Sequence, residues 1–318
     1  MASSPILDLS YRNYDGPLEA PAARWWAIAK MTMRLGVKKR GFWLWAVLSG
    51  YWYLVLMAVF YFTEVFLPTP QQAEQFFARI VWKDQFLNAF SIGQLVYFII
   101  ALLIGIGTIA NDNRANALLI YLSKPCTKLD YIIGKWLGIF VPLTLVVAGP
   151  TLLFYLYGVL SYRHYGFLSQ DPWLIVRLLF MCTIPGIFHA SLALGISSFF
   201  NQGRMAGATY SGVYFLGLFF TKAMQVIHTV SAINGAASPK IVETLYYFAP
   251  DGLQIAMAKI ILGTDGSPLF PGLGGPRGRL PNPIHAPNAA LFALLFFGIC
   301  AMFVLIAWRR VRAVEVVG

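Results

Sequence analysis

Six long apolar runs, separated by shorter polar segments, organise this chain. The runs cover Phe42–Leu67, Phe86–Ala110, Trp136–Leu160, Trp173–Phe200, Ala206–Ile233 and Ala289–Trp308. A helix needs about 20 apolar residues to cross a bilayer, and each run is near or above that length. Trp and Tyr residues stand at several of the edges, as interface anchors do. The pattern predicts six transmembrane helices and therefore an all-α polytopic membrane protein.

Composition supports a membrane protein over a soluble one. Of the 318 residues, 58% are hydrophobic and 12% charged, whereas soluble domains carry about 25% charged residues. A transmembrane β-barrel would show alternating segments of about ten residues instead of continuous apolar runs. The formal charge of +11 would suggest nucleic acid for a soluble chain, but here the cations lie beside the spans, where they set topology and meet membrane lipid. We expect no nucleic-acid partner.

The distribution of Lys and Arg predicts the orientation. With the N-terminus inside, the cytoplasmic segments hold 15 of the 24 Lys and Arg residues and the outer segments hold 7. Cytoplasmic loops carry an excess of these residues. We therefore expect a multi-pass protein of the plasma (inner) membrane with both termini in the cytoplasm.

The segment before the first span has the pattern of an amphipathic helix. Over residues 24–40, cations share one face and apolar residues the other; they are Lys30, Arg34 and Lys38 against Trp25, Ile28, Ala29 and Leu35. Such a helix would lie along the inner membrane interface. The alternative is a topology signal with no other role.

The outer segment 234–288 has two parts. Apolar residues recur at helical spacing over Leu245–Leu262, but Pro250, Asp251 and Gly252 interrupt the pattern. We expect an interfacial or re-entrant pair of short helices there. Residues 265–287, rich in Pro and Gly, predict an irregular loop.

Motifs of catalysis and nucleotide binding are missing. Gly134-Lys135 is followed by Trp136 and has no Gly five residues earlier, so it is not a phosphate-binding loop. The four histidines and three cysteines are scattered, without metal-ligand spacing. We expect no cofactor, no metal site and no enzymatic activity in this chain.

The stretch from Gly107 to Lys135 is the longest polar-patterned segment between two apolar spans. Asn111-Asp112-Asn113 can cap a helix over residues 114–123, which Ser123-Lys124-Pro125 would end. A second short helix, starting near Leu129, would lead to Gly134-Lys135. The pattern predicts a helical bracket at the cytoplasmic surface, with an ordinary inner loop as the alternative.

At these residues the sequence resembles the permease subunit of six-helix (type V) ABC exporters. In that family a span ends in I-A, followed by an acidic-polar helix, a leucine pair, an S-x-P turn, basic residues and Y-x-x-G-K. The matching residues here are Ile109, Ala110, Asp112, Leu118, Leu122, Ser123, Pro125, Lys128, Tyr131, Gly134 and Lys135. The chain departs from the family in having Asp112 where Glu is common, and Asn116-Ala117 where Gly-Thr is common.

The resemblance implies one transmembrane domain over 1–318. Its parts would be a cytoplasmic tail and elbow helix (1–41), spans 1–5 with a coupling segment at 111–135 (42–233), an extracytoplasmic segment (234–288), and span 6 with a tail (289–318). Two permease copies or homologues would pair with two soluble ABC ATPase subunits, which would hold ATP and Mg²⁺.

The resemblance also implies roles for residues of the coupling segment. The apolar anchors on the ATPase would be Leu118, Leu119 and Leu122, and the candidates to meet acidic groups would be Arg114, Lys124, Lys128 and Lys135. Asp112, Pro125 and Gly134 complete the expected interface.

Charged or titratable residues inside the spans are candidates for a translocation path, because such groups usually face protein or water. They are Arg177, His189 and Lys222. Arg177 near an outer end is also consistent with snorkelling, as is Glu64. Lys222 could meet an anionic lipid, a substrate or a helix carbonyl.

Three functions remain open at this point. The leading one is a permease of an ATP-driven exporter. The others are an ATP-independent channel or membrane assembly scaffold, and a membrane enzyme acting on lipid. The substrate is not readable from the residues.

Overall fold

In the computed structural model, residues 24–67, 69–115, 117, 126–234, 239–267 and 284–311 are described, and every regular element in them is a helix. The helices are α1 Arg24–Val37, α2 Arg40–Leu48, α3 Tyr51–Phe66, α4 Pro70–Ala78, α5 Trp82–Gly105, α6 Ala110–Arg114, α8 Lys128–Ser161, α9 Phe167–Gln170, α10 Leu174–Ser197, α11 Gly203–Ile233, α12 Lys240–Tyr246, α13 Pro250–Leu262 and α14 Ala289–Arg310.

Six helical stretches of the described residues are long and apolar enough to cross a membrane, as the sequence predicts. The fourth, fifth and sixth begin and end within three residues of the predicted bounds. The first comprises α2 and α3, with a break at Ser49-Gly50. The Ser49 hydroxyl donates to the carbonyl oxygens of Ala46 (2.6 Å) and Val146 (3.3 Å), which ties the break to α8.

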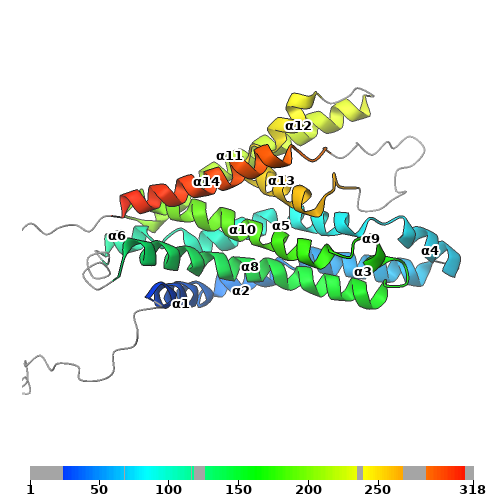
Figure 1. Cartoon of the computed structure of the whole chain (residues 1–318), viewed down its shortest axis with the longest axis horizontal. Helices are drawn as coiled ribbons and strands as arrows, with labels where there is room; N and C mark the ends of the chain where they lie inside the picture. Colours follow the sequence, from blue (N-terminus) through cyan, green and yellow to red (C-terminus); the bar gives the residue numbers. More distant parts are fainter. Residues whose placement is uncertain are drawn as a thin grey trace, which may run out of the picture.

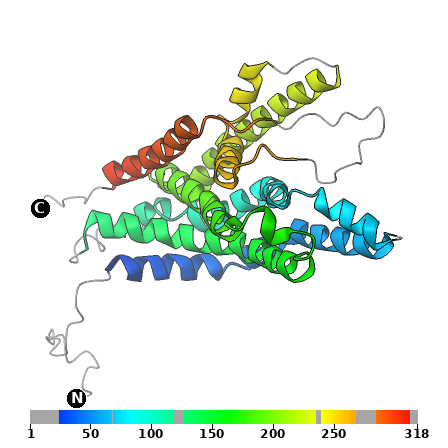
Figure 2. The same ribbon diagram turned by 45° about the vertical axis from the view of Figure 1, so that its right-hand side comes forward.

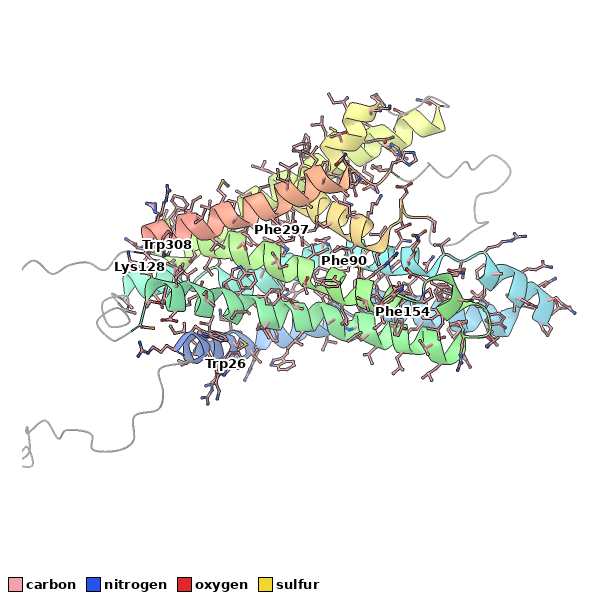
Figure 3. All side chains as sticks on the ribbon, in the orientation of Figure 1. Trp26, Phe90, Lys128, Phe154, Phe297 and Trp308 are labelled. Carbon is pink, nitrogen blue, oxygen red and sulfur yellow. The ribbon has the colours of Figure 1, made fainter. Side chains whose placement is uncertain are left out.

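The long helices lie side by side in one elongated bundle (Figure 1). One end carries α1, α6, the start of α8 and the end of α14, and is called the α1 end below; the other carries α4 and α9 and is called the α4 end. The layers separate in the turned view of Figure 2, where α11, α12 and α14 lie on one side and α1, α2 and α3 on the other. Figure 3 places Lys128 and Trp308 together at the α1 end.

Helix α10 forms the centre of the bundle. It packs against α5, α8, α11, α13 and α14. In its most apolar stretch 78% of the residues are buried, whereas the corresponding share is 17% in α11 and in α14. The exposed faces of α11 and α14 are strongly apolar, with Leu216 73% and Leu294 72% exposed. Apolar exposure of this extent fits contact with lipid tails.

Helix α8 corrects one prediction. The second short helix expected before Gly134-Lys135 does not exist as a separate element, because α8 runs unbroken for 34 residues from Lys128 to Ser161. The Thr127 side chain accepts from the Asp130 N–H (3.1 Å), and Asp130 Oδ2 accepts from the Thr127 N–H (3.0 Å). This capping box starts the helix at Lys128, before its apolar part.

The segment between α11 and α14 contains two short helices, α12 and α13, but their bounds differ from the prediction. Helix α12 lies almost entirely before Leu245, and Pro250, Asp251 and Gly252 form the first turn of α13 instead of interrupting a helix. Helix α13 is not superficial: most of it, from Asp251 to Lys259, is buried against α5, α10, α11 and α14. The predicted loop 265–287 falls mostly outside the described residues.

Candidate functional site

A cluster of polar contacts at the α1 end joins both ends of the predicted coupling segment. Lys135 Nζ of α8 lies 2.8 Å from Asp112 Oδ2 of α6. The Tyr131 hydroxyl, one helical turn before Lys135, donates to the same Asp112 oxygen at 2.7 Å. The carboxylate therefore receives two donors from one face of α8, so α6 and the first turns of α8 meet at this point, although 16 residues separate Arg114 from Tyr131 in the sequence.

Lys135 is almost entirely buried, with 7% of the residue exposed. Its ammonium also donates to the Thr108 carbonyl oxygen at 3.2 Å and lies 5.6 Å from the Tyr131 ring centroid. A buried ammonium is costly unless it is paired and hydrogen-bonded. Asp112, Thr108 and Tyr131 together satisfy it, which fixes α8 to the end of α5 and to α6.

Gly134 provides the contact between α8 and α1. A Cβ at this position would lie 2.6 Å from the Trp25 carbonyl oxygen and 2.7 Å from Ile28 Cβ. Gly138, one turn further, is equally confined against Thr32. Small residues four apart allow two helices to approach closely. Here Gly134 and Gly138 form the surface of α8 on which α1 packs.

The buried face of α1 overlaps the predicted apolar face in part. Ile28 and Ala29 are buried as expected, together with Thr32 and Gly36, whereas Leu35 is 53% exposed. The close packing on Gly134 and Gly138 selects small residues for the buried stripe, and bulky Leu35 lies outside it.

Ser197 at the end of α10 holds the turn between α5 and α6. Its Oγ accepts from the N–H groups of Ile109 (3.2 Å) and Ala110 (3.0 Å) and donates to the Ile106 carbonyl oxygen (2.6 Å). The sequence predicts that Asn111-Asp112-Asn113 caps a helix over residues 114–123. These three residues instead lie inside α6, whose N-cap is Ile109, and most of 114–123 lies outside the described residues. The free N–H groups are satisfied from another helix instead.

The same end of α10 reaches α6 a second time. Asn113 Nδ2 donates to the Phe200 carbonyl oxygen at 3.3 Å. The Arg310 guanidinium at the end of α14 lies 4.3 Å from the Phe199 ring centroid. Helices α1, α5, α6, α8, α10 and α14 are thus linked at this end by contacts of specific side chains.

The described residues include only part of the predicted interface. Leu118, Leu119, Leu122, Lys124 and Pro125 lie outside them. Asp112, Gly134 and Lys135 are engaged within the chain, as described above. Arg114 is exposed at the end of α6, and Lys128 is half-buried in the first turn of α8.

The three predicted path residues bind separate partners. Arg177 donates to the Leu262 carbonyl oxygen (2.9 Å) and lies 3.1 Å from Asp171 Oδ2. Lys222 is exposed on α11 and donates to Gln225 Oε1 at 3.2 Å.

His189, by contrast, is fully buried. Its Nδ1 lies 2.6 Å from the Tyr210 hydroxyl, and its Nε2 3.4 Å from Gln254 Nε2. The structure therefore does not bring His189 together with Arg177 and Lys222.

Sequence reasoning missed Ser197. The available signal is weak: Ser197-Ser198 is a polar pair ending an apolar run, a pattern that also fits an ordinary helix end. Thr108 was missed because it acts through its backbone carbonyl, which carries no side-chain signal.

Comparison with known families decides the class of protein. The sequence model of a family described as "ABC-2 family transporter protein" matches residues 26–311, nearly the whole chain. The chain belongs to the ABC-2 transporter family. It is thus the membrane component of an ABC transporter, a multi-pass permease of a family that lacks an ATP-binding domain and generally pairs with an ATPase subunit. A search among curated proteins returned no match.

Among the described residues, no group of three or more His, Cys, Asp or Glu side chains could hold a metal ion. In the polar cluster, the Asp112 carboxylate and the Lys135 ammonium neutralise each other.

Proposed function

We propose that this ABC-2 permease forms the translocation path of an ATP-driven exporter and couples to a separate ATP-binding subunit through residues 111–135. The observation that carries the proposal is the Asp112–Lys135–Tyr131 cluster, which gathers both ends of that segment onto the helices of the bundle. A force applied to the segment would pass directly to α5 and α8, through Ser197 to α10, and through Gly134 to α1. ATP and Mg²⁺ would be bound by the partner subunit.

The α1 end faces the cytoplasm in this proposal. The cations of α1, of α6, of the start of α11 and of the end of α14 all lie at that end, and cytoplasmic segments carry such an excess. Helix α1 then has the position of an elbow helix, and the chain is a plasma (inner) membrane protein with both termini inside. A second permease copy or homologue completes the transporter.

The translocation path is proposed to include His189, in the polar interior between α10, α11 and α13. The Tyr214 hydroxyl and Gln254 Oε1 are buried there without a partner among the described residues. In a cysteine-free background, His189→Cys should react with a small water-soluble thiol reagent only while the complex turns over ATP. Ala190→Cys, equally buried beside it, should stay unreactive; equal labelling of both variants, or of neither, contradicts the assignment.

Co-purification from native membranes in mild detergent tests the coupling proposal. The tagged wild type should retain a soluble subunit that carries a phosphate-binding loop. A triple Asp variant at Leu118, Leu119 and Leu122 should lose it, because burying each leucine would contribute roughly 1.5–3 kcal/mol to docking. The matched control places three Asp residues at Gln71, Gln72 and Gln75, which are exposed on α4 at the opposite end.

The possible outcomes separate the hypotheses. Loss of the ATPase in the leucine variant alone supports the coupling segment. Retention by that variant shows that the ATPase docks elsewhere. A wild-type complex without any ATPase favours a channel or assembly scaffold, and a turnover that needs no ATP would favour a lipid-modifying enzyme.

A further inference from the structure

A cavity of about 640 Å³ opens at the α1 end, between the junction of α1 and α2, the last turns of α5, α6 and the start of α11. This volume is within the roughly 300–1,000 Å³ typical of small-ligand pockets. None of the coupling contacts described above uses it, although Asn111 and Arg114 of α6 form part of its wall.

Three cations from three different elements face this cavity. They are Lys39, between α1 and α2, Arg114, at the end of α6, and Arg204, in the first turn of α11. No acidic residue is among its lining residues. The described residues provide no ion pair for any of the three cations, and the carboxylate of Asp112 in the adjoining smaller cavity is already bound to Lys135.

Like charges gathered without a counter-charge repel one another, so the arrangement favours an anion between them. Burial lowers the pKa of Lys39, and a bound anion would favour its charged form again. Two guanidinium groups can each bind a phosphate through paired hydrogen bonds. The amides of Asn111 and Gln202 add neutral donors.

The N-terminus of α11 reinforces the positive potential. Arg204 lies in the first turn of this 31-residue helix, where unpaired N–H groups and the helix dipole attract anions. The Ala206 N–H is already bonded to the Gln202 carbonyl oxygen, so the N–H groups of the preceding residues are the ones that remain available.

Apolar side chains in the wall of the cavity indicate the kind of anion. They are Leu102 and Leu103 of α5 and Ile106 just after it, and all three belong to a membrane-spanning helical stretch. Met205, beside Arg204, is 56% exposed. Cations and apolar side chains in the wall of one cavity match an amphipathic ligand with a phosphate head group and a hydrocarbon tail.

We propose that this cavity binds the phosphate head group of an anionic membrane lipid. The lipid would hold the junction of α1 and α2, α6 and the start of α11 together. Its effect on ATPase coupling rests on the proposed function, whereas lipid binding itself does not.

Native mass spectrometry of the full chain in an uncharged detergent tests the site. The probes are dioleoyl phosphatidic acid, dioleoyl phosphatidylcholine and inorganic phosphate. We expect phosphatidic acid to bind at least about ten-fold more tightly than phosphatidylcholine, because each nearby cation contributes roughly 1 kcal/mol toward an anionic lipid. The variant Lys39→Gln/Arg114→Gln/Arg204→Gln should lose about 100-fold in affinity for phosphatidic acid by the same count.

The matched control is Lys30→Gln/Arg34→Gln/Lys38→Gln, which removes the same charge from exposed positions of α1 and its end. It should bind phosphatidic acid like the wild type, and equal loss in both variants would overturn the cavity in favour of general attraction. Inorganic phosphate that competes equally with the lipid would overturn the lipid assignment. If the triple variant fails to fold, the single variant Arg204→Gln replaces it and should bind phosphatidic acid more weakly than the wild type. Arg204→Lys should then bind more tightly than Arg204→Gln. Wild-type affinity in Arg204→Gln, or equal affinity loss in both variants, would overturn the site.

Discussion

A Cβ atom at Gly134 of α8 would lie 2.6 Å from the carbonyl oxygen of Trp25 in α1. That separation is shorter than any Cβ contact a folded helix pair tolerates, and the obstacle is backbone. Gly134, in the proposed coupling segment, therefore has a packing role, because it determines how closely α1 lies on α8.

The first prediction concerns this contact. Gly134→Ala should displace α1 and destabilise the permease by about 1–3 kcal/mol, the usual cost of overpacking. The measurement is thermal unfolding in detergent, together with cross-linking between cysteines placed in α1 and α8. Gly149→Ala is the control in the same helix, because a Cβ there meets nothing within 4 Å; it should be neutral or slightly stabilising. Equal behaviour of the two variants would refute the packing role.

The second prediction concerns the Asp112–Lys135 pair. Asp112→Asn should destabilise the protein by about 3 kcal/mol, because it leaves the ammonium of Lys135 buried and unpaired. The double variant Asp112→Asn/Lys135→Met should recover part of the lost unfolding free energy, because neither buried charge of the pair then remains. A double-mutant cycle on unfolding free energies measures the coupling. Strictly additive effects would show that the two residues act independently.

The third prediction concerns Ser197. Ser197→Ala should cost about 2 kcal/mol, because the buried N–H groups of Ile109 and Ala110 lose their shared acceptor. Ser198→Ala is the matched control, since that hydroxyl donates to Gly195 within its own helix. Hydrogen exchange of the 105–115 amides should rise in the first variant and stay unchanged in the second. Protection retained in Ser197→Ala would contradict the role of this side chain.

The fourth prediction is a pH dependence centred on Lys259 of α13. Burial lowers the pKa of Lys259 to about 8, against an ordinary value of 10.5, while Asp265, Asp84 and Glu243 act in the opposite direction. The unfolded chain binds this proton more readily, so stability should rise as the pH increases from 8 toward 10.5. The integrated gain is about 3 kcal/mol.

The pH experiment compares unfolding across this window. In Lys259→Met, stability should no longer rise over this pH range. In the control Lys83→Met, at a half-buried residue that bonds the Gly263 carbonyl oxygen, the rise should remain. A wild-type curve with the same slope as Lys259→Met would show that Lys259 carries its ordinary pKa.

The membrane-spanning helices were predictable because each depends on local composition. A run of about 20 apolar residues crosses a bilayer whatever it packs against, so α10, α11 and α14 appear close to their expected bounds. The short helices α12 and α13 were predictable only in part, because Pro250 begins α13 instead of interrupting it and α12 lies almost entirely before the predicted range. The motif from Ile109 to Lys135 contains Asp112, Tyr131 and Lys135, but it did not predict that these residues contact one another.

The roles of individual residues were decided by the tertiary structure. Asp112 and Lys135 are residue types that usually lie on the surface, yet here they neutralise each other because α6 and α8 meet at that point. Ser197 accepts hydrogen bonds from N–H groups 87 and 88 residues away in the sequence. Gly134 is confined only because α1 packs on α8 at that position. The length and hydropathy of each span are properties of consecutive residues, so the sequence alone determined them. Which polar groups pair, and which glycine a neighbouring backbone touches, depends on distant segments meeting in space, and only the packed bundle decides that.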